Sequence, residues 1–386
     1  MNPVQAQPPE HEEPEFELPE GIDESETTDP EGVISDPFDP TQIRVERSTP
    51  TIDLLTRRIQ HGEINLAPDF QRKGGIWTDD AKSRLIESIL IRIPLPAFYV
   101  DATDEDRWLV VDGLQRLTTL KRFVVEKDLK LGGLEFLSDL DGKTFDDLPR
   151  NLQRRIEETE VIVFLIQPGT PPAVKFNIFK RINTGGLPLS AQEIRNAING
   201  GRVREFIKSL VESPSFKTAT SNSIGDKRMA DRECVTRFAA FMLTPPAKYS
   251  GKDFDNFLNT TMSRLDDANQ IPDPELLRLA EDFEQAMKRA RRIFGQYAFR
   301  KYYGSNRRLS PINKALFESM SCALARLSET DATILDGRKT EALHAYAELN
   351  NDPEFSASIS QGTGDPNRVR RRFARMEEML QFVTRP

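Results

Sequence analysis

Hydrophobic residues recur at helical spacing through the second half of the chain. A long helix is predicted by apolar residues three or four positions apart, at Leu276, Ala280, Phe283, Met287, Ala290 and Phe294. The same kind of pattern predicts further helices at about 228–243, 253–267, 311–327, 333–348 and 366–383. Strand-like runs are nearly absent here, so residues 201–386 are predicted to form a mostly α-helical domain.

Between residues 41 and 200 the pattern alternates between strand and helix. Strands are predicted where β-branched and aromatic residues cluster, at Phe98–Val100, Trp108–Val111 and Glu160–Ile166. Helices are predicted where apolar residues keep to one face, at Ala81–Ile91, Leu117–Val125 and Val174–Ile182. The expected fold class is therefore α+β, with a compact domain of a few short strands followed by the helical domain.

The first 40 residues have a different composition from the rest. They contain 13 acidic side chains, no Lys or Arg, eight prolines and few apolar residues to bury. Such a segment cannot offset its ordering entropy by burial and is predicted to be disordered. Two roles stay open for it. It is a solubilising tail, or it competes with nucleic acid for a basic groove on the same chain.

The net charge of −8 comes from this tail, because residues 41–386 carry 53 basic and 48 acidic side chains, a net of +5. The overall charge therefore does not exclude a nucleic-acid partner. The longest apolar run has six residues, far below the roughly 20 that cross a bilayer. With two cysteines, Cys234 and Cys322, and no signal-peptide pattern, a cytoplasmic protein without structural disulfides is expected.

The densest candidate site is VVDGLQRLTTL, residues 110–120, where a strand ends at an Asp-Gly turn and a helix follows. A helix start can hold a phosphate on its free N–H groups. Asp112 could hold Mg²⁺ or orient a water that Gln115 positions. Arg116 could bind phosphate, and Thr118 or Thr119 could supply a hydroxyl. The alternative is structural, since Asp112 and Gln115 have the N-cap and N3 spacing of a capping box.

A second candidate is FKRINTGG, residues 179–186, where a helical pattern ends in a glycine loop. Gly185 and Gly186 can take positive φ and let backbone amides approach an anion. Arg181, Asn183 and Thr184 would be its side-chain partners. The alternative is an ordinary helix stop, because helices commonly end in Asn or Gly.

The segment that follows is interpreted as structural. Ser190 and Glu193 have the spacing of a capping box, and Leu189 and Ile194 have that of a hydrophobic staple. Both features would begin a helix after the glycine loop.

A third, weaker candidate is FQRKGGIW, residues 70–77. Gln71 and Arg72 could reach a phosphate or a base, while Trp77 would anchor the loop in the core.

This chain resembles the N-terminal domain of GmrSD-type restriction endonucleases, a ParB/sulfiredoxin-like domain. The resemblance rests on four motifs in the same order: FQRKGGIW, SRLIESILIRIPLPAFYV, VVDGLQRLTTL and FKRINTGGLPLSAQEIRNAI. The resemblance covers about residues 48–200, and AFRKYYG…PINKALFE, residues 298–318, resembles the helical continuation of relatives. It implies a ParB-like domain over residues 41–200 that binds and hydrolyses a nucleoside triphosphate. In this family that activity drives or gates DNA cleavage in defence against phage.

The family's hallmark, DGQQR, falls by position on Asp112, Gly113, Gln115 and Arg116. The resemblance implies that Asp112, Gln115 and Arg116 are catalytic. Leu114 stands where the family commonly has its first glutamine. If that amide touches water or metal, hydrolysis is weakened here while binding persists.

The family's QR falls on Gln71 and Arg72, and its asparagine before the glycines falls on Asn183. The loop from QR to tryptophan is one residue longer here than in the commonest form. The implied site places the nucleotide between these two loops and the DGLQR turn, with Mg²⁺ bridging its phosphates and Asp112.

Relatives usually pair this domain with an HNH-like nuclease, which needs at least one histidine as general base. The chain has three histidines, His11, His61 and His344, and they do not form an HNH pattern. A separate protein, or a carboxylate site without a recognisable motif, would therefore have to cut the DNA. No Walker motif, serine triad or Cys/His metal cluster is present in the sequence either.

A basic patch supports a nucleic-acid role independently. Eight basic residues and no acidic ones lie between residues 286 and 308, interleaved with aromatic residues: Lys288, Arg289, Arg291, Arg292, Arg300, Lys301, Arg307 and Arg308. Such side chains could track phosphates while an aromatic ring stacks on a base. The alternative is a solvated helix face.

Three functions remain open at this stage. The first is an NTP-binding and NTP-hydrolysing regulatory or sensor component of a restriction-like DNA-defence system, acting on DNA with a separate effector. The second is a non-catalytic ParB-like DNA-binding or adaptor protein, which Leu114 and the missing HNH pattern favour. The third is a ParB-like nuclease.

Overall fold

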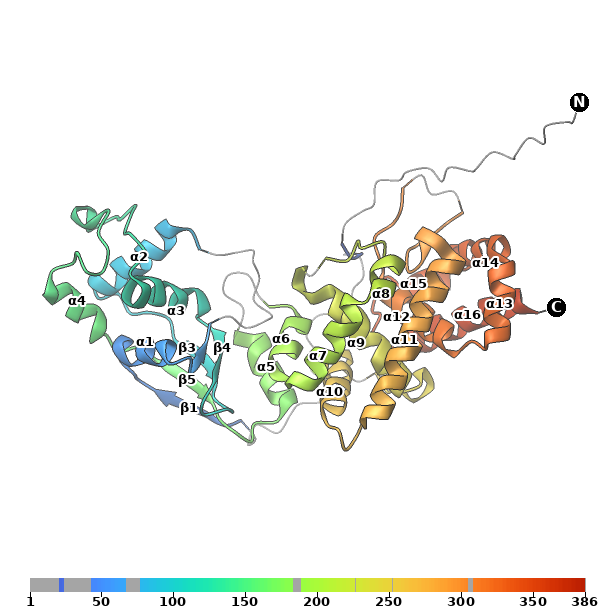
Figure 1. The fold of residues 1–386 in the computed structure, drawn as a ribbon, viewed down its shortest axis with the longest axis horizontal. Coiled ribbons are helices and arrows are strands. Elements are labelled where there is room, and N and C mark those ends of the chain that lie inside the picture. The colour runs from blue at the N-terminus through green and yellow to red at the C-terminus, as the bar shows by residue number, and fades with distance from the viewer. Residues whose placement is uncertain are drawn as a thin grey trace, which may run out of the picture.

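The computed structural model describes residues 21–23, 43–66, 77–182, 189–225, 227–251, 253–304 and 308–385. A five-stranded sheet flanked by helices forms the first half of the molecule, and helices form the second half (Figure 1). The expected α+β fold class, with a mostly helical C-terminal part, is confirmed.

The sheet is mixed, with strand order β1-β5-β3-β4-β2. The strands are β1 (Val45–Ser48), β2 (Ile64–Asn65), β3 (Phe98–Asp101), β4 (Trp108–Asp112) and β5 (Val163–Ile166). The pairing of neighbours alternates between antiparallel and parallel, because β1/β5 and β3/β4 are antiparallel while β5/β3 and β4/β2 are parallel. The three predicted strands are confirmed as β3, β4 and β5. The sequence pattern missed the two edge strands, β1 and β2.

Both faces of the sheet are covered, because strand residues point alternately to opposite sides. One face, with Phe98, Val110 and Leu165, packs in a cluster with the first four helices. The other face packs Val111 and Ile166 against the next two helices. Figure 1 shows these two helices, α5 (Pro172–Ile182) and α6 (Ala191–Ile198), between the sheet and the helical half.

The helices of the first half vary in length from two turns to about three. They are α1 (Ile52–Gln60), α2 (Asp79–Leu90), α3 (Leu114–Leu120), α4 (Arg150–Glu157), α5 (Pro172–Ile182) and α6 (Ala191–Ile198). The predicted helix at 117–125 begins earlier, at Leu114, and continues as a π-helical turn over Lys121–Glu126. The sequence pattern also missed α1 and α4.

Glu87 on α2 holds a long loop through a buried carboxylate. It accepts hydrogen bonds from the N–H groups of Glu135, Phe136 and Leu137, at 3.1, 2.7 and 2.8 Å, and is 3% exposed. Burial alone would raise the pKa of Glu87, but the three N–H groups outweigh it and hold the pKa below its usual value.

Because the pKa of Glu87 is lower in the folded state than in the unfolded state, its ionised carboxylate stabilises the fold above the unfolded pKa of about 4.3. This stabilisation is lost as the pH falls below that value. Glu87→Gln is therefore expected to destabilise the protein at pH 7, and the difference from wild type should shrink between about pH 5 and pH 3. Urea unfolding at several pH values measures this. Glu135→Gln, an exposed neighbour, should show no such pH trend, and a difference for Glu87→Gln that is constant with pH would contradict the assignment.

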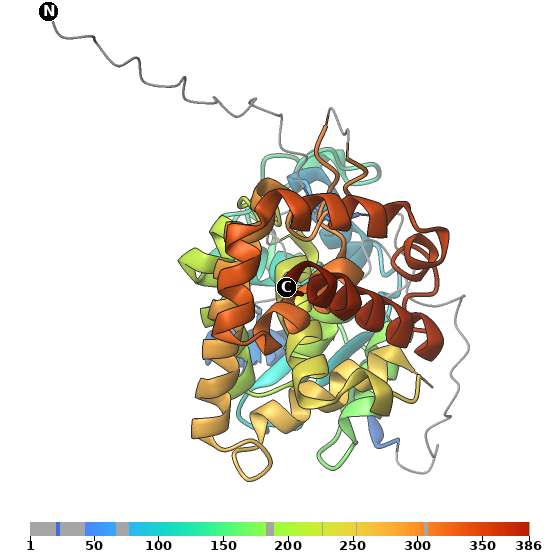
Figure 2. The same cartoon turned by 90° about the vertical axis from the view of Figure 1, so that its right-hand side faces the viewer.

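The described residues of the second half form ten α-helices, and Figure 2 looks onto them from the side of the C-terminus. They are α7 (Gly201–Glu212), α8 (Pro214–Ala219), α9 (Ala230–Leu243), α10 (Phe254–Asp266), α11 (Asp273–Phe294), α12 (Lys314–Arg326), α13 (Glu329–Gly337), α14 (Lys339–Asn351), α15 (Pro353–Ser358) and α16 (Pro366–Thr384). The predicted stripe on α11 is confirmed, with Phe283, Met287 and Ala290 buried in the main core.

One helix predicted from the sequence is two separate helices in the structure. The apolar pattern at 333–348 is interrupted at Gly337 and Arg338, where α13 ends and α14 begins. Arg338 has φ −117° and ψ 41°, which no α-helix accommodates. Apolar spacing alone does not reveal such a change of direction, so the prediction of one helix is wrong.

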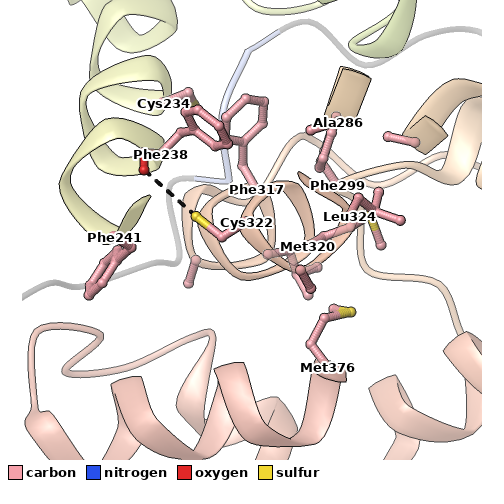
Figure 3. Packing of buried hydrophobic residues seen from close by; sticks show 14 of the residues in the cluster. Cys234, Phe238, Phe241, Ala286, Phe299, Phe317, Met320, Cys322, Leu324 and Met376 are labelled. Carbon is pink, nitrogen blue, oxygen red and sulfur yellow. Dashed lines mark hydrogen bonds between the residues drawn. The ribbon is translucent and has the colours of Figure 1, made fainter. Parts of the chain in front are cut away.

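Figure 3 shows part of the helical core, where Phe238 and Phe241 of α9 lie near Phe317 and Cys322 of α12. The two cysteines are free and buried. The thiol of Cys322 approaches the carbonyl oxygen of Phe238 at 3.7 Å, and burial raises the pKa of this thiol. Both cysteines therefore act as packing residues. Within the described parts of the chain, every helix is too short or too polar to cross a membrane.

Candidate nucleotide site

The DGLQR segment forms a tight turn from β4 into α3. β4 ends at Asp112, and Gly113 precedes the first residue of α3 with φ +97°. A Cβ atom at Gly113 would lie 2.4 Å from the ring of Phe98, which is closer than real carbon contacts. Both the positive φ and the close approach therefore require glycine here.

The capping-box interpretation of Asp112 and Gln115 is wrong. The N-cap of α3 is Gly113, and no side chain caps this helix. The Oδ2 atom of Asp112 instead accepts a hydrogen bond from Nη2 of Arg116 at 2.8 Å. The Oε1 atom of Gln115 accepts from the backbone N–H of Trp77 at 3.2 Å.

Arg116 is a buried positioning residue in this structure. Its guanidinium donates to the carbonyl oxygens of Pro96 and Ala97, and its Cζ lies 4.5 Å above the ring of Phe98. Burial lowers the pKa of Arg116, and the charge of Asp112 opposes this shift. Only 8% of Arg116 is exposed, so its guanidinium fixes Asp112 and the chain before β3 in place rather than facing solvent.

Asp112 is the accessible acid of the motif. Its side chain is 30% exposed, and its Oδ1 atom receives no hydrogen bond from the residues that the structure describes. One carboxylate oxygen is thus held by Arg116, and the side chain as a whole stays partly exposed. This arrangement can bind a water or a divalent cation.

The two threonines of the motif differ. Thr119 is fully buried, and its hydroxyl donates to the carbonyl oxygen of Gln115 at 2.8 Å. Thr118 is half-buried and makes no side-chain hydrogen bond within the described structure. Leu114 packs against the apolar core of the sheet. Thr118 is therefore the hydroxyl of the pair that is open to a ligand.

The remaining predicted nucleotide residues lie mostly outside the described residues, namely Gln71, Arg72, Asn183, Thr184 and Gly185. Arg181 is described. It is exposed in the last turn of α5, the helix whose Phe176 and Phe179 pack against Val111 beside Asp112. The end of α5 and the end of β4 are thus joined by one apolar cluster.

No group of three or more acidic, histidine or cysteine side chains that could hold a metal occurs within the described ranges. Asp112 offers a single carboxylate. Mg²⁺ in nucleotide sites is commonly bound by one or two carboxylates together with the phosphates. A single described carboxylate fits a cation that arrives with the phosphates of a nucleotide.

α6 begins as predicted, with a capping box formed by Ser190 and Glu193. Leu189 and Ile194 pack in the same apolar cluster, as the staple prediction expects.

The sequence did not reveal that α6 also anchors the helical half. Arg195, which is 1% exposed, pairs with Asp255 of α10 at 2.9 Å, and Lys180 of α5 pairs with the same carboxylate at 2.9 Å.

Several buried polar atoms at this junction have no partner in the described structure. They are Nε and Nη1 of Arg195, Oε1 of Gln192, Nδ2 of Asn196 and Oδ1 of Asn259. Buried polar groups of this kind are commonly satisfied by internal water. The junction of α6 with α9 and α10 is therefore polar as well as buried.

The predicted nucleic-acid residues fall into groups. Arg289 and Arg300 lie in the core, where they donate to carbonyl oxygens of Leu324 and Ser310 respectively. Burial lowers the pKa of Arg300 to about 10. These two guanidinium groups are largely buried in the fold, and that of Arg289 also pairs with the exposed Glu329 at 2.6 Å.

The others lie nearer the surface. Three are paired with carboxylates, Lys288 with Glu284, Arg292 with Asp336, and Lys301 with Asp23. Arg291 is half-buried and Arg308 is exposed, while Arg307 is outside the described residues.

The described histidines are far apart, because His61 follows α1 and His344 lies on α14, at opposite ends of the molecule (Figure 1). They form no common site within the described structure.

A search of curated proteins gives no match to this chain. A family model does match. It is described as the N-terminal domain of the GmrSD restriction endonuclease, and it covers residues 52–199, which include all five residues of DGLQR and the whole of helices α1 to α6. Residues 52–199 are thus similar to the N-terminal domain of the GmrSD restriction endonuclease.

Proposed function

We propose that the chain is a component of a restriction-like DNA-defence system that binds and hydrolyses a nucleoside triphosphate and acts on DNA with a separate effector. The family match over residues 52–199 supports a role in such a system. The observation that carries the nucleotide site is Asp112, a carboxylate held by a buried arginine with one oxygen open to a ligand.

In this proposal the residues of the motif have distinct roles. Asp112 orients a water or meets the cation that accompanies the phosphates. Arg116 is a positioning residue for Asp112, since its guanidinium is buried. Gln115 uses Oε1 to hold Trp77, which leaves its Nε2 group to donate to a ligand. Mg²⁺ bound with the nucleotide would neutralise phosphate charge.

The proposal is tested with Asp112→Asn, which keeps the shape of the side chain and removes its charge. We expect the wild type to bind at least one of ATP, GTP, CTP and UTP with Mg²⁺ and to release phosphate. The variant should hydrolyse about 100-fold more slowly, the scale of effect that a water-orienting carboxylate has. Phosphate release is measured with and without DNA.

Asp104→Asn is the matched control, because Asp104 is an exposed carboxylate in the turn before β4, at the other end of that strand. It should leave binding and hydrolysis unchanged. No binding of any of the four nucleotides to the wild type, or equal turnover in the wild type and Asp112→Asn, would contradict the proposal.

A second candidate function is a non-catalytic DNA-binding or adaptor protein. The packing of Leu114 into the core, where the resemblance implies a polar glutamine, favours it. DNA binding that depends on salt and ignores every nucleotide would support this candidate.

A further inference from the structure

A short N-terminal segment, Gly21–Asp23, is docked on the helical half, whereas the next described residues lead into β1 of the sheet. The N–H of Gly21 donates to the carbonyl oxygen of Ser223 at 2.9 Å, and that of Asp23 donates to Ile312 at 2.8 Å. Ile22 forms a parallel bridge with Ile312. On its other side Ile312 bridges Arg300, so three extended segments lie side by side.

Side chains add specificity to these backbone bonds. Ile22 packs against the apolar core of the helical half. The Oδ2 atom of Asp23 lies 2.7 Å from Nζ of Lys301 and 3.2 Å from Nδ2 of Asn313, which is fully buried. Strand addition of this kind uses the backbone for affinity and alternate side chains for selection. The groove therefore recognises an extended segment with an apolar residue followed by an acidic one.

The docked segment lies in the middle of the acidic tail and beside the basic segment 288–308. Asp23 neutralises Lys301, with both side chains largely buried at 13% and 14% exposure. The 40 N-terminal residues carry 13 carboxylates. Anchoring the tail at residues 21–23 raises their effective concentration beside the exposed Arg308 and the 43% exposed Tyr303.

We infer that Gly21–Asp23 is an intramolecular docking segment that covers Lys301, tethers the acidic tail to the helical half and competes with polyanions for this surface. The competitor is covalently attached, because the chain continues from Asp23 to β1 at the edge of the sheet. Its effect is therefore independent of protein concentration. The inference goes beyond the proposed nucleotide site and does not depend on it.

The test uses Ile22→Asp in the full chain, because docking and simple charge predict opposite results. The substitution adds a negative charge, which by itself weakens polyanion binding. It also places a carboxylate in an apolar contact, which releases the segment. We expect protection of the Gly21 and Asp23 amides from hydrogen exchange to be lost, and heparin to bind about fivefold or more tightly.

Heparin is the first probe because it detects the basic surface whether or not DNA is the natural ligand. With duplex DNA, the freed Lys301 should steepen the dependence of log K on log salt by about 0.9. If heparin binding changes and no DNA binding is seen, the docking inference holds while the DNA role fails.

Ile34→Asp is the matched control, since it adds the same charge to the same tail at a residue outside the docked segment. It should weaken heparin binding slightly. The inference is overturned if both variants weaken binding equally, if the Gly21 and Asp23 amides of the wild type are unprotected, or if their protection depends on protein concentration.

Discussion

Glu318→Gln is expected to lower the free energy of unfolding of the helical half by about 3–5 kcal/mol, the usual cost of removing one partner from a buried ion pair. Glu318 on α12 is fully buried. Its Oε1 accepts from Nε of Arg372 at 2.8 Å, and its Oε2 pairs with Nη1 of Arg237 at 3.4 Å. Both guanidinium groups are at most 2% exposed, so neither can turn to water when the charge of Glu318 is removed.

The pair belongs to a longer chain of charges. Arg237 also pairs with Glu233 at 2.8 Å, and Glu233 pairs with Lys314 at 2.8 Å. Burial alone would raise the pKa of Glu233, but the cations Lys314, Arg237 and Arg195 together hold it well below its usual value. Glu233 therefore is already ionised in the fold, so it has no further negative charge to offer when that of Glu318 is removed.

Glu354→Gln is the control for this prediction. Glu354 pairs at 3.5 Å with Arg371, the neighbour of Arg372 on α16, and both side chains are exposed. Exposed pairs contribute about 0–1 kcal/mol. Urea unfolding followed by circular dichroism reports mainly the helices. An equal decrease in the free energy of unfolding in the two variants would show that burial does not make the substitution at Glu318 more destabilising.

Gly113→Ala is expected to destabilise the first half of the molecule. The φ of +97° costs a residue with a Cβ about 1–2 kcal/mol. The new Cβ would also lie 2.4 Å from the ring of Phe98, and overpacking of this kind costs about 1–3 kcal/mol. Relief would require Phe98 to move, although its ring supports the guanidinium of Arg116. The turn that presents Asp112 should therefore be disturbed together with stability.

Gly62→Ala separates these two costs. Gly62 follows α1, has φ +76°, and has open space where a Cβ would stand. Gly62→Ala should therefore lower the free energy of unfolding only by the cost of the positive φ. Trp77 and Trp108 are the two tryptophans of the chain, and both lie in the first half, so their fluorescence during urea unfolding reports this half. Equal losses in the two glycine variants would show that Phe98 gives way freely.

The sequence predicted the long amphipathic elements well, because one apolar face against the core leaves a periodic signal. α11 is an example. The strands β3 to β5 were predicted instead from their clusters of β-branched and aromatic residues. β2 has only two residues, Ile64–Asn65, which is too short for any periodicity. β1 is an edge strand whose residues are mostly exposed, so it lacks an apolar alternation. The break between α13 and α14 depends on packing between distant helices, which no local pattern reports.

The sequence indicated where the candidate site lies better than it indicated how the side chains there interact. The turn from strand to helix brought Asp112 and Arg116 into the prediction, and the structure pairs them. The burial of Arg116 could not be read from the sequence, because the carbonyl groups it binds belong to residues about 20 positions earlier. Arg289 and Arg300 show the same limit, since a basic run does not tell which guanidinium groups turn inward.

The pairing of Arg195 and Lys180 with Asp255 has a consequence for how this domain is inherited. The family match ends at residue 199, yet the charge of Arg195 is balanced by α10, more than 50 residues later. The end of the family match is thus not a place where contacts between the two halves of the molecule stop. A gene fusion that joined this domain to a different C-terminal region would have to provide a carboxylate in place of Asp255, because α6 carries a buried cation that its own domain does not neutralise.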